Sequence, residues 1–447
     1  MEEYDLIIVG AGPAGLFCAY EISKKTNLKF LIIDKGKAPL ERLRNKDDIM
    51  CGVGGAGCMS DGKLNIDPYI GGDLKELFND EKIAYEIIDY VDNIFVKFGA
   101  PKEMMLNNGK TQKLKQKASQ AGIKYIPIRQ KHIGSDNLPK LIDKIKKEIE
   151  KKGDFLLNTT VFDIITKNDN VKGVILDNDK KIYSKKVILA PGRSGNEWFN
   201  KIIENHNLDI QYNPIDVGVR VETLYDIFKD LTDINYDPKI HIYTKKYKDF
   251  VRTFCTNPKG FVASEGYNGF IGVNGHAQKN KQSTNTNFAL LTRVYLTSPQ
   301  ENTLKYGKSI AQLATTIGGG KVILQTLGDL KNNQRSTFSR IQKSFVNPTL
   351  KNFTPGDISM ALPYRIVENI LEAIKKLDSI APGINSDNTL LYAPEIKYHS
   401  IKAKHDENLM SLKINNLFFA GDGGGLTRDI MNAAATGIFI ARKFISK

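Results

Sequence analysis

An apolar segment that runs directly into a glycine turn places the strongest constraint on the fold of this chain. Asp5–Val9 is followed by Gly-Ala-Gly-Pro-Ala-Gly at positions 10–15, and a helical pattern of apolar residues extends from Pro13 to about Lys25. A strand, a G-x-G-x-x-G turn and a helix in this order are typical of an α/β dinucleotide-binding fold. Asp34 ends the next predicted strand, 19 residues after Gly15, and is expected to accept hydrogen bonds from both hydroxyls of an adenosine ribose.

The residues of this turn have separate physical roles. Gly10 allows the tight turn, Gly12 lets backbone amides approach a pyrophosphate, and Gly15 lets the helix pack against the strand. The pyrophosphate is expected at the positively polarised N-terminus of the helix. Pro13 suits the first helical turn, where a backbone N–H has no helical partner.

The last part of the chain carries a second strand, glycine turn and helix. Leu417–Ala420 runs into Gly-Asp-Gly-Gly-Gly at positions 421–425, and a predicted helix rich in alanine follows. A carboxylate at Asp422 suits a ribityl hydroxyl, which a nicotinamide cofactor lacks. The amides near Gly424 to Thr427 are expected to face the pyrophosphate or the flavin pyrimidine edge. The two ends of the chain therefore predict one bound FAD.

A third stretch, at positions 52–57, also matches G-x-G-x-x-G. The residues before it make a poor buried strand and no helical pattern follows, so we interpret it as a glycine loop that passes close to the cofactor. No other stretch has the strand, turn and helix context. We therefore expect no dedicated nicotinamide domain, and NAD(P)H only as a transient electron donor.

The expected FAD-binding residues come from these turns and from the loops beside them. They are Gly10, Gly12, Pro13, Ala14, Gly15, Asp34, Lys35, Arg42, Gly55, Ala56, Gly57, Val161, Ala190, Pro191, Gly192, Gly421, Asp422, Gly424, Gly425 and Leu426.

Composition argues against several other classes of protein. The formal net charge is +14, but the lysines are scattered along predicted helices, and arginines, which nucleic-acid recognition uses heavily, are sparse. We interpret the charge as a solvated surface and expect no nucleic-acid partner. No apolar run approaches the length of a membrane span. The acidic start, Met1–Tyr4, does not resemble a signal peptide, so we expect a cytoplasmic protein.

The cysteines predict neither a disulfide framework nor a metal site. Four cysteines occur in 447 residues, and no pair has C-x-x-C spacing. Cys51 and Cys58 fall where thiol-reducing flavoenzymes carry a redox pair, but six residues separate them where that pair has four. We interpret them as small core thiols.

The order of predicted elements indicates an α/β protein with an insertion. We expect a Rossmann-like FAD-binding domain in two parts, residues 1–213 and 349–447, and an inserted α+β substrate domain at 214–348. In the first part we expect one amphipathic helix over 73–98 and a meander that includes strands at 181–183 and 187–190. A helix from Pro363 to Lys376 is expected to return the chain to the first domain.

Five motifs in order carry a family resemblance. Besides positions 10–15 and 421–425, they are Gly-Gly-Ala-Gly-Cys-Met-Ser-Asp-Gly-Lys-Leu (54–64), Val-Ile-Leu-Ala-Pro-Gly-Arg-Ser (187–194) and Val-Gly-Val-Arg-Val-Glu (217–222). Over nearly its whole length the chain resembles FAD-dependent dehydrogenases of bacteria and archaea, in the glutathione-reductase-type flavoprotein class. It departs from them at Arg193–Asn196, where Ser-Ala-Arg-Asp is usual, and at Cys58, where threonine is usual. The resemblance implies a fold and a flavin, and no substrate.

Three residues are the candidates for chemistry beside the flavin. Lys63 could place a positive charge near the flavin pyrimidine, or be a surface lysine. His276, in a glycine-flanked loop, could donate a proton, although a lone loop histidine is more often structural. Arg193 could bind a substrate carboxylate or neutralise phosphate, and Arg220 has the same fork. His399 is a weaker candidate of the same kind as His276.

The sequence thus predicts an FAD-dependent oxidoreductase that exchanges a hydride between flavin N5 and a small organic substrate. One alternative is a prenyl-lipid reductase of the geranylgeranyl type, and another is a flavin-dependent tRNA-modifying or RNA-binding protein. The substrate, the direction of the reaction, the electron partner and the oligomeric state stay open.

Overall fold

The computed structural model describes residues 3–43, 48–60, 62–104, 108–134, 136–267, 269–277, 281–299, 301–399 and 401–445. The chain forms two compact units. The first unit comprises Met1–Met105, Arg129–Asn213 and Ser400–Lys447, and the second comprises Leu106–Ile128 and Pro214–His399. The first unit has one continuous hydrophobic core and the second has a larger and a smaller one.

A seven-stranded sheet forms the centre of the first unit, with the order β6-β2-β1-β9-β8-β7 and with β21 paired to β9. Its parallel part aligns Ile8 with both Ile32 and Ile188, and all three side chains are buried. Burial on both faces explains why these strands are near-continuous apolar runs. The strands are β1 (Glu3–Val9), β2 (Phe30–Ile33), β6 (Asp154–Leu156), β7 (Val161–Lys167), β8 (Asn170–Leu176), β9 (Lys181–Leu189) and β21 (Leu417–Phe419).

β9 is one strand where the sequence predicted two. Ser184 and Lys186 pair with Tyr4 and Leu6 of β1 and so continue the ladder across the polar stretch. Lys185 between them points outward and lies 2.8 Å from Asp5. The prediction left Ser184–Lys186 outside both strands, and pairing with β1 joins them into one.

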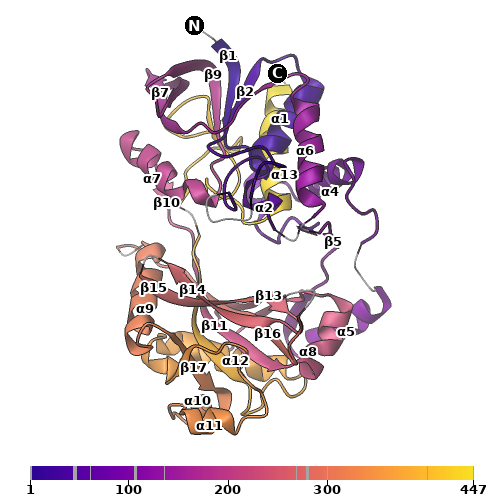
Figure 1. The fold of residues 1–447 in the computed structure, drawn as a ribbon, viewed down its shortest axis with the longest axis vertical. Helices are drawn as coiled ribbons and strands as arrows, with labels where there is room; N and C mark the ends of the chain where they lie inside the picture. Colours follow the sequence, from indigo (N-terminus) through magenta and orange to yellow (C-terminus); the bar gives the residue numbers. More distant parts are fainter. Residues whose placement is uncertain are drawn as a thin grey trace. The chain divides into compact units, whose positions relative to one another are not determined.

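Two long helices of the first unit pack closely along each other (Figure 1). They are α1 (Pro13–Lys25) and α13 (Ile430–Ile445). A Cβ atom built on Gly437 would lie 2.0 Å from the carbonyl oxygen of Ala14, so only glycine allows this approach. The other helical and short elements of this unit are α2 (Gly55–Cys58), α3 (Leu74–Phe78), α4 (Glu81–Lys97), α6 (Leu138–Ile149), α7 (Asn196–Asn205), η1 (Arg193–Gly195), β3 (Lys63–Asn65), β5 (Gln130–His132), β10 (Ile210–Gln211) and β20 (Lys402–Ala403).

The single helix expected over 73–98 is two helices. α3 ends at Phe78, and Asn79 after it has a left-handed backbone with φ of 52°. Asp80 then starts α4 by accepting a hydrogen bond from the backbone N–H of Ile83. An asparagine in this conformation followed by a capping aspartate is a strong signal for a break, and the apolar periodicity concealed it.

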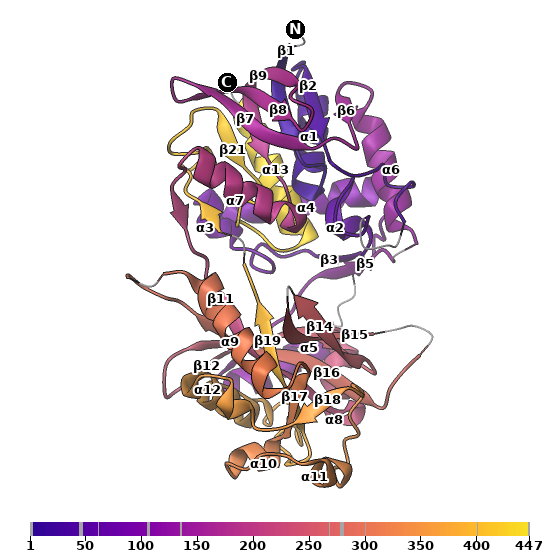
Figure 2. The same cartoon turned by 60° about the vertical axis from the view of Figure 1, so that its left-hand side comes forward.

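An eight-stranded sheet forms the centre of the second unit, with the order β18-β17-β19-β11-β16-β13-β12-β4 (Figure 2). The pair β17–β18 is parallel and the other pairs are antiparallel. The strands are β4 (Ile123–Ile126), β11 (Ile215–Leu224), β12 (Lys239–Tyr243), β13 (Phe250–Asn257), β16 (Asn285–Val294), β17 (Val322–Thr326), β18 (Phe353–Pro355) and β19 (Leu390–Lys397).

Helices and a hairpin complete the second unit. The larger core joins the sheet to several helices, and the hairpin contributes to the smaller core. These elements are α5 (Asn108–Gln120), α8 (Tyr225–Ile234), α9 (Thr303–Ile317), α10 (Leu327–Lys331), α11 (Phe338–Gln342), η2 (Ile358–Met360), α12 (Tyr364–Leu377), β14 (Phe261–Tyr267) and β15 (Phe270–His276).

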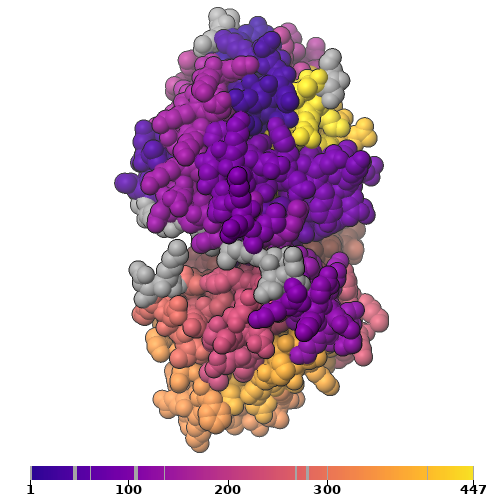
Figure 3. Space-filling model, turned by 90° about the vertical axis from the view of Figure 1, so that its right-hand side faces the viewer, coloured from indigo at the N-terminus to yellow at the C-terminus, as the bar shows by residue number. Residues whose placement is uncertain are grey.

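The second unit was expected to comprise residues 214–348. Its observed limits agree at 213/214 and differ in two places. The segment Leu106–Ile128 joins the second unit because β4 pairs with β12. Figure 3 shows residues 108–128, in purple, beside the pink and orange surface of that unit. Residues 349–399 also stay in the second unit. β19 lies between β17 and β11 in the middle of the sheet, so the chain returns to the first unit only at position 400.

The predicted α/β fold with a Rossmann-like first unit is confirmed by the parallel strands, the glycine turn and the helix that follows it. Within the described ranges, no helix combines the length and the apolar character needed to cross a membrane.

Candidate functional site

The N-terminal glycine turn forms a tight cradle. Gly10 has φ of 104°, and a Cβ atom there would lie 2.1 Å from the carbonyl oxygen of Ala190, so the turn contacts the end of β9. A Cβ atom on Gly15 would lie 1.9 Å from the carbonyl oxygen of Gly10. Gly12 differs, because its Cβ atom would meet only the Cα atom of Gly55, at 3.9 Å. Gly12 therefore faces open space at the N-terminus of α1.

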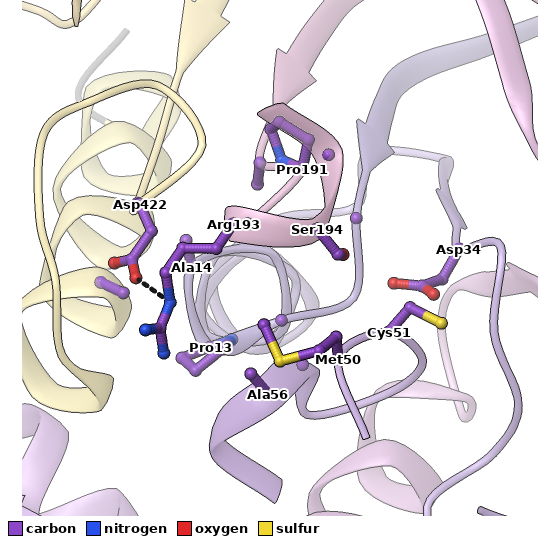
Figure 4. A pocket seen from close by; sticks show the side chains of 18 of the residues that line it. Pro13, Ala14, Asp34, Met50, Cys51, Ala56, Pro191, Arg193, Ser194 and Asp422 are labelled. Atoms are coloured by element: carbon purple, nitrogen blue, oxygen red, sulfur yellow. Dashed lines mark ion pairs between the residues drawn. The ribbon is translucent and has the colours of Figure 1, made fainter. Parts of the chain in front are cut away.

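A cavity of about 340 Å³ lies in the first unit over this turn (Figure 4). Most of the expected FAD-binding residues line it, and so do Lys63 and Arg193. Those FAD-binding residues are Gly10, Gly12, Pro13, Ala14, Asp34, Lys35, Gly55, Ala56, Gly57, Val161, Ala190, Pro191, Gly192, Gly421 and Asp422. Figure 4 shows Asp34 and Asp422 on opposite sides of the residues around Pro13.

Asp34 ties three turns together. One carboxylate oxygen accepts from the backbone N–H of Ala11 at 2.8 Å, and the other accepts from Gly36 at 2.8 Å and from Gly52 at 2.9 Å. A carboxylate has about four acceptor positions, so these bonds leave one for a further donor. Asp34 can therefore accept from both ribose hydroxyls, as expected, only if one of these three amide hydrogen bonds breaks.

Asp422 and Arg193 form an ion pair across the cavity wall. Nε of Arg193 lies 3.5 Å from Oδ2 of Asp422, as the dashed line in Figure 4 marks. The hydroxyl of Thr427 donates to Oδ1 of Asp422 at 3.1 Å. Burial raises the pKa of Asp422 to about 6, and the Arg193 charge and the Thr427 hydrogen bond oppose that rise.

Asp429 is a lining residue that the sequence analysis missed. Oδ1 accepts from the backbone N–H of Asn432 at 2.7 Å, as at the start of a helix, and Oδ2 has no hydrogen-bond partner among the described residues. Burial, and then the Asp422 charge, raise its pKa to about 8 against the opposing Asn432 hydrogen bond. An aspartate three residues before an asparagine, at the start of an alanine-rich helix, was the available signal.

Other lining residues were not among the expected FAD-binding residues, although the glycine loop that contains Gly52 was expected to pass close to the cofactor. They come from β1, β2, η1, α7 and α13 as well as from loops. They are Val9, Ile33, Met50, Cys51, Gly52, Ser60, Thr159, Thr160, Ser194, Gly195, Trp198, Arg428, Ile430 and Ala433.

Arg42 lies behind the lining. It is 6% exposed, and its guanidinium donates to the backbone carbonyls of Asp48, Ile49 and Val53. Nε, Nη1 and Nη2 each donate to the backbone of the glycine loop, which argues for a structural role.

The turn at 424–426 also lies outside the lining. The N–H of Gly425 donates to the carbonyl of Asp422, and that of Leu426 donates to Gly421. The sequence analysis expected these amides to face the cofactor. Both instead donate within their own turn and do not point into the cavity. Gly424 is buried against the end of β21.

The remaining candidates divide between the units. His276 belongs to the second unit, at the end of β15, where its ring stacks on Phe261 with centroids 6.0 Å apart. Arg220 is also in the second unit and is bound on both branches by Glu395, at 2.7 and 2.6 Å. Its Nε and Nη2 are therefore engaged by Glu395, and carboxylate binding by this fork stays a prediction. His399 lies 3.6 Å from Asp216.

Cys51 and Cys58 both belong to the first unit, and neither is in a disulfide bond. Burial raises the pKa of each thiol, which disfavours the thiolate that redox exchange needs. Asp61, in the same loop, lies outside the described residues. Across the described part of the chain, no group of three or more His, Cys, Asp or Glu side chains could hold a metal ion.

The cavity fits FAD on three observations. Gly12 faces the cavity at a helix N-terminus whose first turn carries no acidic residue, which suits a pyrophosphate. A Cβ atom on Gly192 would meet nothing within 4 Å, so the wall is open at the end of β9 as well. Carboxyl groups at Asp34 and Asp422 supply acceptors for hydroxyl groups on two sides.

Comparison with known proteins agrees with this geometry. Residues 4–199 match the family model for pyridine nucleotide-disulphide oxidoreductases, and residues 214–398 match that for FAD-dependent protein, C-terminal domain-like. An uncharacterized protein of Clostridium beijerinckii is 24% identical in an alignment of 476 positions that covers 99% of this chain and 80% of that protein. Thiamine thiazole synthase 4 of Physcomitrium patens is 54% identical over 35 residues, 8% of this chain and 10% of that protein.

Among solved structures, pyridoxine 4-oxidase from Mesorbium loti is similar over 99% of both chains, at 12% identity and a TM-score of 0.49. The cavity of the first unit and the two family-model matches lead to one conclusion. This chain is an FAD-dependent oxidoreductase.

Proposed function

We propose that the protein is a glutathione-reductase-type flavoenzyme in which bound FAD exchanges a hydride at flavin N5 with a small organic substrate. The first unit is the FAD-binding domain and the second unit is the substrate domain in this proposal. The observation that carries it is the cavity over the glycine turn. Gly10, Gly12, Pro13 and Ala14 line it from the N-terminal part of the chain, and Gly421 and Asp422 from the C-terminal part.

Each end of the cofactor has a proposed partner in this chain. The N-terminus of α1 and the backbone at Gly12 would hold the pyrophosphate. Asp34 would accept from the adenosine ribose through its remaining acceptor position. Asp422 would accept from a ribityl hydroxyl, and its orientation is supported by Arg193 on one oxygen and Thr427 on the other.

Lys63 and His276 are the proposed residues for charge and proton transfer. Lys63 lines the cavity from β3, so its ammonium would compensate negative charge there. His276 would supply a proton from the second unit. NAD(P)H is the proposed transient electron donor, because the sequence has no second nucleotide-binding motif for a resident one.

The proposal is tested by anaerobic reduction of the purified protein, followed by flavin absorbance. We expect a yellow protein whose absorbance bleaches on addition of NADH or NADPH. A protein that is colourless and cannot be reconstituted with FAD would refute the proposal. If the protein binds FAD but neither NADH nor NADPH reduces it, the result would still agree with an oxidoreductase but would exclude NAD(P)H as the electron donor.

Gly12→Leu gives a sharper test of the cavity. The site has an ordinary φ of −70° and room for a Cβ atom, so the variant should fold, but its side chain fills the place proposed for the pyrophosphate. We expect bound FAD to fall at least about tenfold, measured as the ratio of flavin to protein absorbance.

The matched control for this variant is Gly109→Leu, in α5 of the second unit. A Cβ atom at Gly109 meets nothing within 4 Å, and this position is in the other unit, so FAD content should stay at the wild-type level. Circular dichroism verifies folding of both variants. Equal FAD content in Gly12→Leu and Gly109→Leu would contradict the proposed pyrophosphate site.

A further inference from the structure

One face of the second unit's sheet carries a carboxylate shared by two arginines. Asp216 of β11 is fully buried. Arg252 donates from Nε and Nη2 to its Oδ2 at 3.0 and 2.6 Å, and Arg293 donates from Nε to its Oδ1 at 3.1 Å. Strand register explains the cluster, because Asp216 pairs directly with Arg293.

A second buried carboxylate on the same face is shared in the same way. Glu395 of β19 accepts the bidentate fork of Arg220, and Lys397 lies 3.0 Å from its Oε1. Asp216 pairs with Lys397 across β11 and β19, so the two clusters adjoin. Counted over these ion pairs of described residues, four cationic side chains share two carboxylates.

Two phenylalanine rings lie among these cations. The guanidinium of Arg252 is 4.8 Å from the ring centroid of Phe254, and that of Arg293 is 4.8 Å from the ring of Phe250. The ammonium of Lys397 lies 5.8 Å from the ring of Phe254. We call Phe250, Arg252, Phe254, Arg293 and Lys397 the cationic face.

The positive charge of this face is largely shielded from water. The side chains of Arg252, Lys397 and Arg293 are 16%, 19% and 23% exposed. Holding an excess of cations at this burial costs desolvation free energy unless an anion compensates it. His241 on the neighbouring strand pairs with Arg252 and lies in the same positively charged surroundings. Its pKa is lowered to about 3 by burial and by the charges of nearby arginines and lysines.

We infer that the cationic face binds the carboxylate of a small organic acid, with its carbon skeleton against Phe250 and Phe254. Guanidinium groups match a carboxylate in shape and charge, and the rings offer an apolar surface that inorganic anions do not use. The inference rests on the proposed function, since it identifies the substrate class of the second unit. A nucleic acid is disfavoured, because its backbone needs exposed rather than shielded cations.

The test is calorimetric titration of the FAD-loaded full chain with succinate, 2-oxoglutarate and benzoate, and with benzamide and succinamide as neutral counterparts. At least one carboxylate should bind, with an affinity at least about tenfold above that of the amides. Inorganic phosphate should compete weakly. Equal binding of acids and amides, or phosphate binding as tight as the best acid, would overturn the inference.

Two variants locate the binding. Lys397→Gln leaves the Arg220–Glu395 pair in place, and Arg252→Gln leaves Arg293 on Asp216, so both should fold. Each should weaken carboxylate binding by about tenfold. Arg335→Gln, at an exposed position of the same unit, makes the same change in net charge and should have no effect. If Arg335→Gln and Lys397→Gln lose the same carboxylate affinity, the overall charge of the protein attracts the anion and the cationic face is not a specific binding site.

Flavin absorbance in the same samples separates this inference from the proposed function. Flavin that is present and reducible, in a protein that binds no carboxylate, would overturn the inference alone. Absent flavin would overturn the proposed function, whatever the titrations give.

Discussion

Burial in the cavity wall, and then the Asp422 charge, raise the pKa of Asp429 to about 8, so we expect its carboxyl group to be protonated near neutral pH. In an unfolded chain an aspartate titrates near about 3.9. Between these values the folded state binds more protons than the unfolded state, so stability falls as the pH rises, by at most about 1.4 kcal/mol per pH unit for one group. Asp429→Asn keeps an oxygen for the Asn432 N–H and removes the titration. We expect the variant to gain stability relative to wild type between about pH 5 and about pH 8.

Urea unfolding of both proteins across this pH range measures the difference. Asp226→Asn, at an exposed position of the second unit, is the control for the loss of one acidic group. If wild type and Asp429→Asn keep a constant difference in stability from pH 5 to pH 8, the carboxyl is not protonated in the folded protein.

Some residues of the site could be predicted from the sequence and others could not. Gly12, Asp34 and Asp422 were predictable because a local motif fixes each of them on a turn at the end of a strand. Arg220 was not, because its fork is occupied by Glu395, 175 positions away. Arg42 was predicted to bind FAD, which stays a prediction, and its hydrogen bonds to backbone carbonyls of a loop could not be read from any sequence pattern.

Packing between α1 and α13 determines where the glycine turn lies. Gly437 contacts the backbone of Ala14, so Gly437→Ala must push the helices apart and move the N-terminus of α1. We expect a loss of about 1–3 kcal/mol in stability, as for overpacked cores, together with weaker FAD binding. Thermal unfolding and flavin content measure the two effects.

Gly109→Ala is the matched control for that variant. It makes the same substitution within a helix, where the added Cβ atom contacts nothing, and should stabilise by about 0.4–1 kcal/mol. Effects of the same sign at positions 437 and 109 would show that helix propensity, rather than the contact with Ala14, sets the outcome.

Elements were predictable where one local signal dominated. α1, α13 and the parallel strands have apolar patterns that agree with the glycine turns beside them. β9 was split in the prediction because Ser184–Lys186 is polar, while its pairing with β1 is a contact between distant segments. The break between α3 and α4 was missed because a continuous apolar face was weighted above Asn79 and Asp80.

At the scale of the whole molecule, the chain crosses between its two units near positions 105, 128, 213 and 399. The early crossing carries β4 to the edge of the second sheet, and β19 keeps residues up to 399 in that sheet. Neither placement has a local signal, because a strand at a sheet edge and one at its centre can show the same short apolar pattern. Domain limits therefore depended on pairings that a single sequence does not display.

Because the two units have separate hydrophobic cores, we expect a substitution that destabilises the second unit to leave the stability of the first unit unchanged. Glu395→Gln leaves Arg220 buried without a carboxylate, which should cost about 3–5 kcal/mol. Hydrogen exchange should then accelerate in β11 and β19, while β1, β9 and the flavin content stay unchanged. Glu301→Gln, at an exposed position of the second unit, should alter neither. Faster exchange in β1 and β9 as well would contradict this expectation, because it would mean that both cores unfold together. The flavin content should then fall too.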